Sequence, residues 1–488
     1  MALGIFVCAI VIIICISSSK LSGKIGVPTL LLFIILGMLF GCDGIVGIKF
    51  NSYDLTEQLC SVALIFIMFY GGFGTSWSAA KPVAVKAILL STVGVIITAG
   101  ATGLFCHYYL KMSILDGLLV GCVVSSTDAA SVFSILRGKK LGLVDGLASV
   151  IEIESGSNDP VAYTLTVVIL SLISANGTTS IPYLIFSQVV YGLGIGFTVA
   201  FLAVFILKKV SFEVNGLHTI FVTAIALLAY SLPCLVGGNG YLSVYIVGIV
   251  LGNSKILHKV ELVHFFDGIT WLMQILIFFI LGLLAWPSHM IKILPASIAI
   301  AFFLTFIARP LATFSILSWF KMPVNQQLFV SWAGLRGAAS IVFAIFAMTN
   351  GSQAQFDLFH IVFCVAMLSV GIQGTLLIPL AKMLGLVNND HNTVLKTFTD
   401  YQEETDLNLM ELKIEPNSGW VGCSLSQLNL SSDILVVMIK RSTGVIIPRG
   451  DTIIKSNDTL VVSATDFAEL EKKFASVVKE QISAEIKK

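Results

Sequence analysis

Two apolar segments of the chain carry acidic side chains among small polar residues. Ser125–Asp128 reads Ser-Ser-Thr-Asp, and Glu152–Pro160 reads Glu-Ile-Glu-Ser-Gly-Ser-Asn-Asp-Pro. Carboxylates, hydroxyls and backbone carbonyls are ligands of hard cations, and the set offers no soft ligand to a transition metal. Apolar surroundings favour the protonated form of a carboxyl group, so a proton and a monovalent cation can compete for it. Such competition gives exchange if the site crosses only when loaded with one or the other.

The spacing within the second segment divides its polar side chains between two faces of a helix. Ser155 and Asp159 are four residues apart, and so are Glu154 and Asn158. Residues four apart share one helical face. We therefore expect Ser155 and Asp159 to face one ligand, and Glu154 and Asn158 to face another partner. Pro160 frees a backbone carbonyl one turn earlier.

Two arginines in apolar segments could balance these acids. Arg336 lies in Gly-Leu-Arg-Gly, and a buried structural pair between Glu154 and Arg336 is as well supported as a role in transport. Even so, the segments hold three acids, Asp128, Glu154 and Asp159, for the one arginine Arg336. If all are ionised, two negative charges remain, and protons or a cation must neutralise them. Arg309 is expected to pair structurally or to extend toward the interface.

Composition places most of the chain in a membrane. Of 488 residues, 56% are hydrophobic and 12% are charged, against about 25% charged in ordinary soluble domains. This excludes a soluble enzyme, a disordered chain and a secreted disulfide scaffold. The balance of 29 basic and 28 acidic residues gives no indication of a nucleic-acid partner, and the Cys and His residues lack metal-ligand spacing. We expect no enzymatic activity and no cofactor.

The charged residues are concentrated at one end of the chain. Of the 57, 25 lie in the last 98 positions. We therefore predict a transmembrane domain at 1–387, a linker at 388–404 and a soluble domain at 405–485. The fold class is an all-α polytopic membrane protein with a small α+β cytoplasmic domain.

Apolar segments about 20 residues long predict transmembrane helices. We place thirteen spans near 2–19, 26–42, 58–76, 83–109, 115–136, 145–174, 181–207, 215–235, 239–254, 265–285, 291–319, 325–350 and 357–387. Basic residues gather in the loops at the ends of odd-numbered spans, which places those loops in the cytoplasm. The N-terminus is then outside the cell membrane and the soluble domain is cytoplasmic.

A short sequence motif is repeated in the fifth and twelfth spans. Thr-Asp-Ala-Ala-Ser-Val-Phe begins at Thr127, and Arg-Gly-Ala-Ala-Ser-Ile-Val-Phe begins at Arg336. The two copies are an odd number of spans apart, so they run in opposite directions. Inverted repeats with broken helices are typical of secondary transporters. Chance recurrence of Ala-Ala-Ser in helices rich in small residues is the alternative.

These motifs resemble the NhaP-like branch of monovalent cation:proton antiporters. Ser-Ser-Thr-Asp-Ala-Ala, Glu-Ser-Gly-Ser-Asn-Asp-Pro and Gly-Leu-Arg-Gly match that family in order and spacing over most of residues 1–387. The resemblance implies inverted repeats of six helices, crossed discontinuous helices at spans five and twelve, a homodimer and elevator-like alternating access.

The resemblance also implies roles for individual residues. Asp159 would be the exchanging carboxylate. The other members of the cation site would be Asp128, Ser155 and the carbonyl of Thr127, and the adjacent structural cluster would be Glu154, Asn158 and Arg336. Relatives with Asn-Asp exchange one cation for one proton, whereas those with Asp-Asp are electrogenic. Asn158 therefore predicts electroneutral exchange.

The sequence departs from the family pattern in span three. Many relatives carry an acidic residue before Gly-Gly, where this chain has Tyr70 before Gly71-Gly72. The departure bears on the contribution of span three to the ion site and on ion selectivity. The place of Glu152 is also open; two residues from Glu154, it faces elsewhere, at a helix end or an interface.

The soluble domain is predicted to contain four strands and one helix. The strands lie at Leu407–Ile414, Leu435–Lys440, Val445–Pro448 and Thr459–Ser463, and the helix lies at Asp466–Ala475. Its Gly422-x-Ser-Leu, Ile447-Pro-x-Gly-Asp-Thr and Asp458-x-Leu-Val-Val elements resemble a TrkA-C domain. The resemblance implies dimerisation and a small regulator such as a cyclic dinucleotide or nucleotide. A passive dimerisation module is equally compatible.

The leading hypothesis is a secondary antiporter that exchanges K⁺ for H⁺ in the cell membrane, with Na⁺ as the other candidate cation. K⁺ is favoured because TrkA-C domains accompany potassium-handling proteins. The alternatives are a cation-coupled symporter of a small solute and a membrane-anchored ligand sensor. The sensor leaves the costly intramembrane carboxylates unexplained, and no substrate cavity stands out for the symporter.

Overall fold

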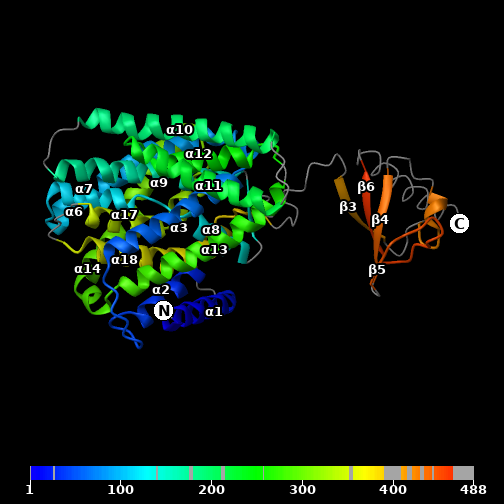
Figure 1. The fold of residues 1–488 in the computed structure, drawn as a ribbon, viewed down its shortest axis with the longest axis horizontal. Helices are drawn as coiled ribbons and strands as arrows, with labels where there is room; N and C mark the ends of the chain where they lie inside the picture. Colours follow the sequence, from blue (N-terminus) through cyan, green and yellow to red (C-terminus); the bar gives the residue numbers. More distant parts are fainter. Residues whose placement is uncertain are drawn as a thin grey trace. The chain divides into compact units, whose positions relative to one another are not determined.

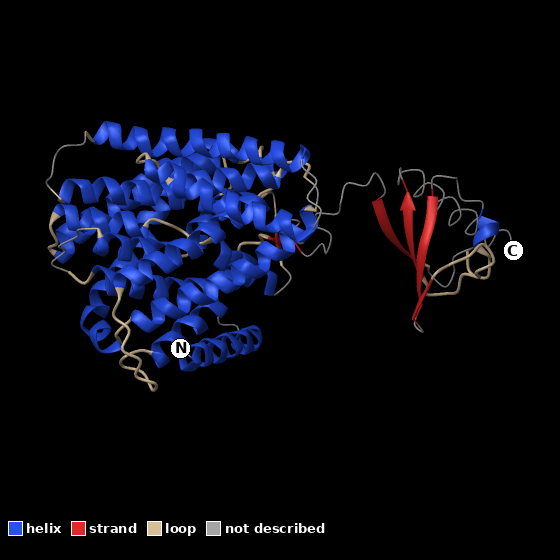
Figure 2. Cartoon of the chain, viewed as in Figure 1, coloured by secondary structure: helices blue, strands red, loops and turns tan. Residues whose placement is uncertain are grey.

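A computed structural model gives the fold in two compact units, Met1–Asp400 and Tyr401–Lys488 (Figure 1). The residues that the structure describes are 2–25, 28–138, 141–144, 146–174, 180–209, 215–256, 258–350, 356–388, 408–414, 420–428, 434–441 and 444–464. In the described residues, the regular structure of the first unit is helical apart from one antiparallel strand pair, β1 (Gly142–Leu143) with β2 (Val387–Asn388), and the second unit contains the main sheet (Figure 2).

Each of the thirteen predicted spans contains helix. The helical elements of the first unit are α1 (Ala2–Ile25), α2 (Thr29–Phe40), α3 (Tyr53–Gly74), α4 (Trp77–Ala80), α5 (Ala84–Leu89), η1 (Leu90–Gly94), α6 (Val95–Leu110), α7 (Ile114–Val124), α8 (Ala129–Gly138), α9 (Leu147–Ile173), α10 (Ile181–Lys209), α11 (Asn215–Leu235), α12 (Gly240–Gly252), α13 (Lys259–Leu284), α14 (Pro287–Phe303), η2 (Leu304–Ala308), α15 (Arg309–Leu317), η3 (Ser318–Phe320), α16 (Val324–Ala333), α17 (Ala338–Thr349), α18 (Leu358–Leu368), η4 (Ser369–Gln373) and α19 (Gly374–Met383). By length and apolar composition, eight helices in the described residues could cross a membrane, or nine if the bent pair α16–α17 is one span.

Side-chain caps fix the start of several helices. Ser52 accepts a hydrogen bond from the N–H of Leu55 at the start of α3, and Asn239 accepts one from Leu242 at the start of α12. Asp357 caps α18 in the same way. Since the first four N–H groups of a helix lack partners within it, each cap satisfies a donor that would otherwise be costly to bury.

Two of the predicted spans are broken helices. Residues 125–128 separate α7 from α8. Residues 334–337 separate α16 from α17, and these two helices are bent by 48° relative to each other. Both breaks fall on the Ser-Ser-Thr-Asp and Gly-Leu-Arg-Gly elements, in the two spans where the family resemblance implies discontinuous helices. In contrast, the span near 145–174 is one continuous helix, α9, which runs through Pro160.

Helices α2, α3, α12 and α13 pack on one another and form what we call the four-helix group. Close backbone approach needs glycine here. A Cβ atom on Gly248 of α12 would lie 2.4 Å from the carbonyl oxygen of Phe69 in α3, and one on Gly37 of α2 would lie 2.2 Å from that of Phe279 in α13. Helix α9 packs between this group and the broken helices, since it contacts α3 and α12 as well as α7, α8 and α17.

The second unit contains an antiparallel sheet of β3 (Asn408–Lys413), β6 (Thr459–Ala464), β4 (Ile434–Arg441) and β5 (Gly444–Ile446), in that order. These strands match the four predicted ones, while the predicted helix at Asp466–Ala475 lies outside the described residues, as does the linker beyond Asn388. The unit has a core of its own, made of Ile414, Trp420, Ile439, Ile454, Leu460 and Val462.

One buried ion pair joins two strand ends of this sheet. The guanidinium of Arg441 donates to both oxygens of the Asp458 carboxylate, at 2.8 and 2.7 Å, and the N–H of Lys455 donates to Asp458 at 2.8 Å. The hydrogen bonds from Arg441 hold the pKa of Asp458 below its usual value. The ionised carboxylate therefore stabilises the folded domain above the unfolded pKa of about 3.9, and that contribution is lost as the pH falls through the folded value.

We predict that Arg441→Gln lowers the stability of the isolated 401–488 domain by about 1–3 kcal/mol at neutral pH, because a buried carboxylate loses its partner. Urea unfolding followed by the fluorescence of Trp420 measures the change. Arg449→Gln, at an exposed arginine, is the matched control. The difference between the two variants should shrink below about pH 4; a difference independent of pH would contradict the role of the ionised pair.

Candidate cation site

The two helix breaks lie against each other and exchange hydrogen bonds. The N–H of Asp128 donates to the carbonyl of Leu335 at 2.8 Å. Arg336 Nη1 donates to the carbonyls of Ser125 and Ser126 at 2.7 and 3.0 Å. A Cβ atom on Gly337 would lie 2.3 Å from a carboxylate oxygen of Asp128, so the closeness of the breaks requires glycine. Backbone groups freed by unwinding are thus satisfied within the protein, as the membrane demands.

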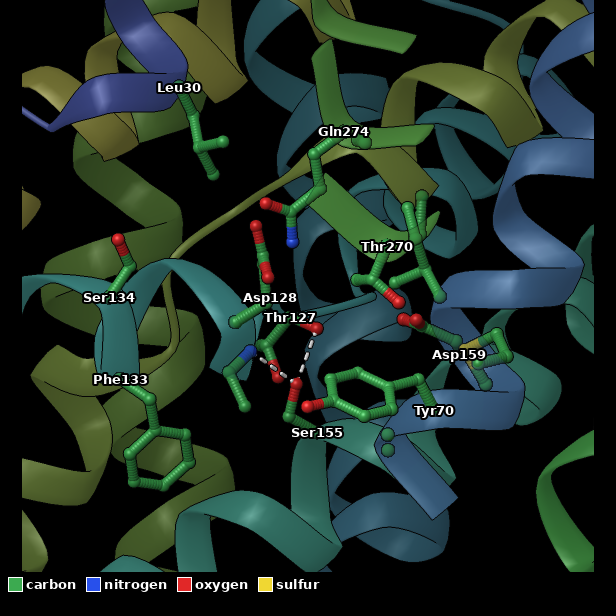
Figure 3. A pocket seen from close by; sticks show the side chains of 18 of the residues that line it. Leu30, Tyr70, Thr127, Asp128, Phe133, Ser134, Ser155, Asp159, Thr270 and Gln274 are labelled. Atoms are coloured by element: carbon green, nitrogen blue, oxygen red, sulfur yellow. Dashed lines mark hydrogen bonds between the residues drawn. The ribbon is translucent and has the colours of Figure 1, made fainter. Parts of the chain in front are cut away.

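Ser155 joins α9 to the first break. Its hydroxyl donates to the carbonyl of Thr127 at 2.7 Å and accepts from the N–H of Ala129 at 2.7 Å (Figure 3). Asn158, one turn further along α9, donates to Thr127 Oγ1 and accepts from the N–H of Thr127 at 3.4 Å. The break is therefore fixed to α9 by the side chains that the sequence singles out.

The two carboxylates of the predicted cation site have different surroundings. Asp128 accepts bonds from the N–H and the hydroxyl of Ser131, and so caps the first turn of α8. Asp159 accepts a bond from the hydroxyl of Ser126 and is 8% exposed. Asp128 thus shares its charge with a helix N-terminus, which favours anions, whereas Asp159 has a neutral hydroxyl partner.

A cavity of about 530 Å³ opens beside these groups (Figure 3). Its lining includes all four residues of the predicted cation site, Thr127, Asp128, Ser155 and Asp159. The other acidic residues in the lining are Glu152 and Asp267, and no Lys, Arg or His is among the lining residues in the part of the chain that the structure describes. A low-dielectric cavity with charges of one sign concentrates counter-ions, here cations.

The cavity extends toward one end of the bundle. Besides Asp159 at mid-helix, its lining includes Leu30 near the start of α2, Ile135 near the end of α8 and Ile378 near the end of α19. These positions adjoin the loops that follow the first and fifth predicted spans and the segment after the thirteenth. All are odd-numbered spans.

Glu154 and Asn158 are not among the lining residues of the cavity, and they share another partner, as the helical spacing predicts. Glu154 Oε2 pairs with Arg309 Nη2 at 2.9 Å, with both side chains 2% exposed, and Glu154 Oε1 accepts from Asn158 at 3.2 Å. Arg336 is instead bonded to backbone carbonyls. The alternative of a buried pair between Glu154 and Arg336 is therefore wrong, and the partner of Glu154 is Arg309. Arg309 follows the π-turn η2, which sequence periodicity does not reveal.

Sequence reasoning missed two acids of the cavity, Asp267 and Glu152. Asp267 of α13 accepts a hydrogen bond from the hydroxyl of Tyr70 in α3, at 3.1 Å. Tyr70 is the residue that departs from the family pattern, so the position remains part of the cavity wall. Asp267 lies in the first turn of the predicted tenth span, and the rule that intramembrane charges need a reason could have found it. Glu152, which the sequence places at a helix end or an interface, instead lines the cavity and accepts a hydrogen bond from Thr75 Oγ1 at 3.2 Å.

Comparison with known proteins assigns the family. The family described as "Sodium/hydrogen exchanger, transmembrane" matches residues 8–383, and the TrkA-C domain matches residues 409–475. The chain belongs to the sodium/hydrogen exchanger family. Cation/proton exchange is therefore its activity, as the intramembrane carboxylates predict, and its relatives are transporters in the cell membrane.

Individual proteins similar to this exchanger are also named as cation/proton antiporters. A K⁺/H⁺ antiporter NhaP of Alkalimonas amylolytica is 36% identical over 79% of the chain and 67% of its own length. A K⁺/H⁺ antiporter NhaP2 of Shewanella sp. (strain ANA-3) is 32% identical over 91% of the chain and 78% of its own length. The sodium proton antiporter MjNhaP1 of Methanocaldococcus jannaschii shares the fold, with a TM-score of 0.69 and 22% identity over 78% of this chain and 99% of that one.

We predict that Glu154→Gln destabilises the exchanger, because Arg309 is left as an unpaired buried charge, a loss of about 3–5 kcal/mol. The measurement is the melting temperature of the purified protein in detergent. The double variant Glu154→Gln/Arg309→Met should recover part of the loss. A single variant that melts like the wild type would show that the pair does not stabilise the fold.

Proposed function

We propose that the exchanger moves one K⁺ against one H⁺ at Asp159. The observation that carries the proposal is the position of Asp159. Its carboxylate lies in an acidic cavity beside the hydroxyl of Ser155 and the unwound Thr127–Asp128 segment. Protonation of Asp159 removes the charge that holds the cation, and cation binding displaces the proton, so the two ligands exclude each other.

The other residues have supporting roles in this proposal. Asp128, Ser155 and the carbonyl of Thr127 complete the cation shell, while Glu154, Asn158 and Arg336 form the structural cluster beside it, with Arg309 added as the partner of Glu154. In this structure the hydroxyl of Ser155 donates a hydrogen bond to the carbonyl of Thr127. Cation binding would turn that hydroxyl oxygen and the carbonyl toward the ion.

K⁺ is the favoured cation because the two NhaP relatives named above, which match most of the chain, are K⁺/H⁺ antiporters. The TrkA-C domain adds the same association. Oxygen ligands alone do not separate K⁺ from Na⁺, so Na⁺ stays the competing candidate.

We propose an N-terminus outside the cell membrane, the thirteen spans predicted above, and a cytoplasmic tail. The loop charges support this orientation. Since the cavity opens toward the loops of odd-numbered spans, the arrangement is then the inward-facing one. Spans 4–6 and 11–13 would be corresponding parts of two inverted repeats of six helices each. In each, a helix with a π-turn, η1 or η2, precedes a broken helix, α7–α8 or α16–α17.

We predict that Asp159→Asn abolishes exchange without unfolding the protein, because the amide neither releases a proton nor carries the charge that binds the cation. The assay uses vesicles with an imposed pH gradient and a pH-sensitive dye, to which K⁺ or Na⁺ is added. Glu261→Gln, at an exposed acid in the first turn of α13, is the control. A folded wild-type protein that ignores both ions, or an Asp159→Asn variant that responds, would refute the proposal.

The same vesicles test the stoichiometry. One-for-one exchange moves no net charge, so clamping the membrane potential with a K⁺ or Na⁺ ionophore should leave the rate unchanged. A clear dependence on the potential would mean that Asn158 does not mark electroneutral exchange.

For the domains we propose transport in residues 1–387, a linker at 388–404 and regulation by 405–485, which would also support a homodimer. A cyclic dinucleotide or nucleotide that binds the tail should raise the melting temperature of the isolated 401–488 domain. A panel of nucleotides that produces no shift would favour the passive dimerisation module.

A further inference from the structure

One face of α13 presents three polar side chains to the cavity. Asp267, Thr270 and Gln274 are three and four residues apart, the spacing of one helical face, and all three line the cavity. In Figure 3, Thr270 and Gln274 extend into the space that Thr127, Asp128 and Asp159 face from the other side. None of the three belongs to the cation site described above.

We propose that Asp267 and Thr270, with the side-chain amide oxygen of Gln274, form a second and weaker monovalent-cation site on the four-helix group. A cation would pause there, partly hydrated, before it reaches Asp159. The inference rests on the proposed function, since it supplies a loading site for the same transported ion.

The hydroxyl of Thr270 points to a ligand. Thr270 is 7% exposed, yet its Oγ1 has no hydrogen-bond partner in the described structure. Helical threonines usually satisfy this group locally. Thr98, Thr164 and Thr166 each donate to the carbonyl four residues earlier, at 2.7 to 2.9 Å. Two other buried helical threonines, Thr102 and Thr313, also lack a partner in the described structure, but neither lines the cavity. A buried hydroxyl left unpaired costs free energy, and a cation at the cavity wall would supply the missing interaction.

Asp267 is held in place for such a role. The hydroxyl of Tyr70 bonds Asp267 Oδ1 at 3.1 Å, which fixes the carboxylate against the wall. An ionised carboxylate has about four acceptor positions, so this bond leaves capacity for an ion. No basic side chain of the described lining residues offers it an ion pair within the cavity.

A structural role is the competing explanation. The Tyr70–Asp267 bond links α3 to α13 and could exist only to hold the four-helix group together. That role explains the bond but not the unpaired hydroxyl one turn further along α13. It also predicts that variants at Asp267 change stability, whereas a loading site predicts a change in the cation concentration needed for exchange.

The deciding variants are Thr270→Val and Thr270→Ser, assayed by dye recovery over a series of K⁺ and Na⁺ concentrations. Valine has nearly the shape of threonine, and since the hydroxyl has no protein partner, its loss should not destabilise the fold. We expect Thr270→Val to raise the half-saturating cation concentration about three- to tenfold with little change in the maximal rate, and Thr270→Ser to restore it. An unchanged value in Thr270→Val overturns the proposal.

Asp267→Asn should raise the half-saturating concentration by about tenfold or more, because the charge that attracts the ion is lost. Glu261→Gln on the same helix is the matched control and should behave like the wild type. A lower melting temperature with an unchanged half-saturating concentration would assign Asp267 the purely structural role.

A binding measurement separates this inference from the proposed function. In Asp159→Asn, which cannot exchange, K⁺ should still raise the melting temperature at high concentration, and the further change Thr270→Val should remove that shift. If the double variant keeps the shift, the site on α13 is refuted even though exchange at Asp159 stands. If wild-type vesicles do not exchange, exchange at Asp159 fails, while the melting shift still reports on α13.

Discussion

The contact between the two unwound segments is the constraint on which the rest of the site depends. Each break exposes backbone N–H and carbonyl groups at a depth where no bulk water can satisfy them. The bond from Asp128 N–H to the Leu335 carbonyl and the bonds from Arg336 to the carbonyls of Ser125 and Ser126 solve this problem mutually. Each break therefore satisfies backbone groups of the other, and the first break also contains Thr127 and Asp128 of the predicted cation site.

Much of this arrangement could be predicted from the sequence. The two faces of α9 and the four strands of the tail follow from local rules of spacing and propensity. These rules act within one segment, and the structure agrees with each of them. The breaks at Ser-Ser-Thr-Asp and Gly-Leu-Arg-Gly follow from the family resemblance. The family resemblance added roles for Asp159 and its neighbours, which stay predictions until variants are measured.

Partners that come from distant segments could not be predicted in this way. The choice of Arg309 over Arg336 for Glu154 depends on the π-turn η2, which shifts the register of the helix just before Arg309. The place of Asp267 depends on the packing of α3 against α13, since only that contact brings Tyr70 within bonding distance. Spacing along one helix contains no information on either contact.

The charge balance of the site bears on the stoichiometry of exchange. Glu154 is compensated by Arg309, and Asp128 is compensated in part by the N-terminus of α8 that it caps. Arg336 is committed to backbone carbonyls. Asp159 is then the carboxylate of the predicted site whose charge has no fixed counterpart, because its bonded partner is a neutral hydroxyl. Within the predicted site, leaving aside Glu152 and Asp267 of the cavity wall, a single uncompensated carboxylate can be neutralised by one proton or by one monovalent cation, and either load leaves the same net charge to cross the membrane. With an acid in place of Asn158, a second uncompensated charge would enter the cluster, and the equality of the two loaded states would be lost.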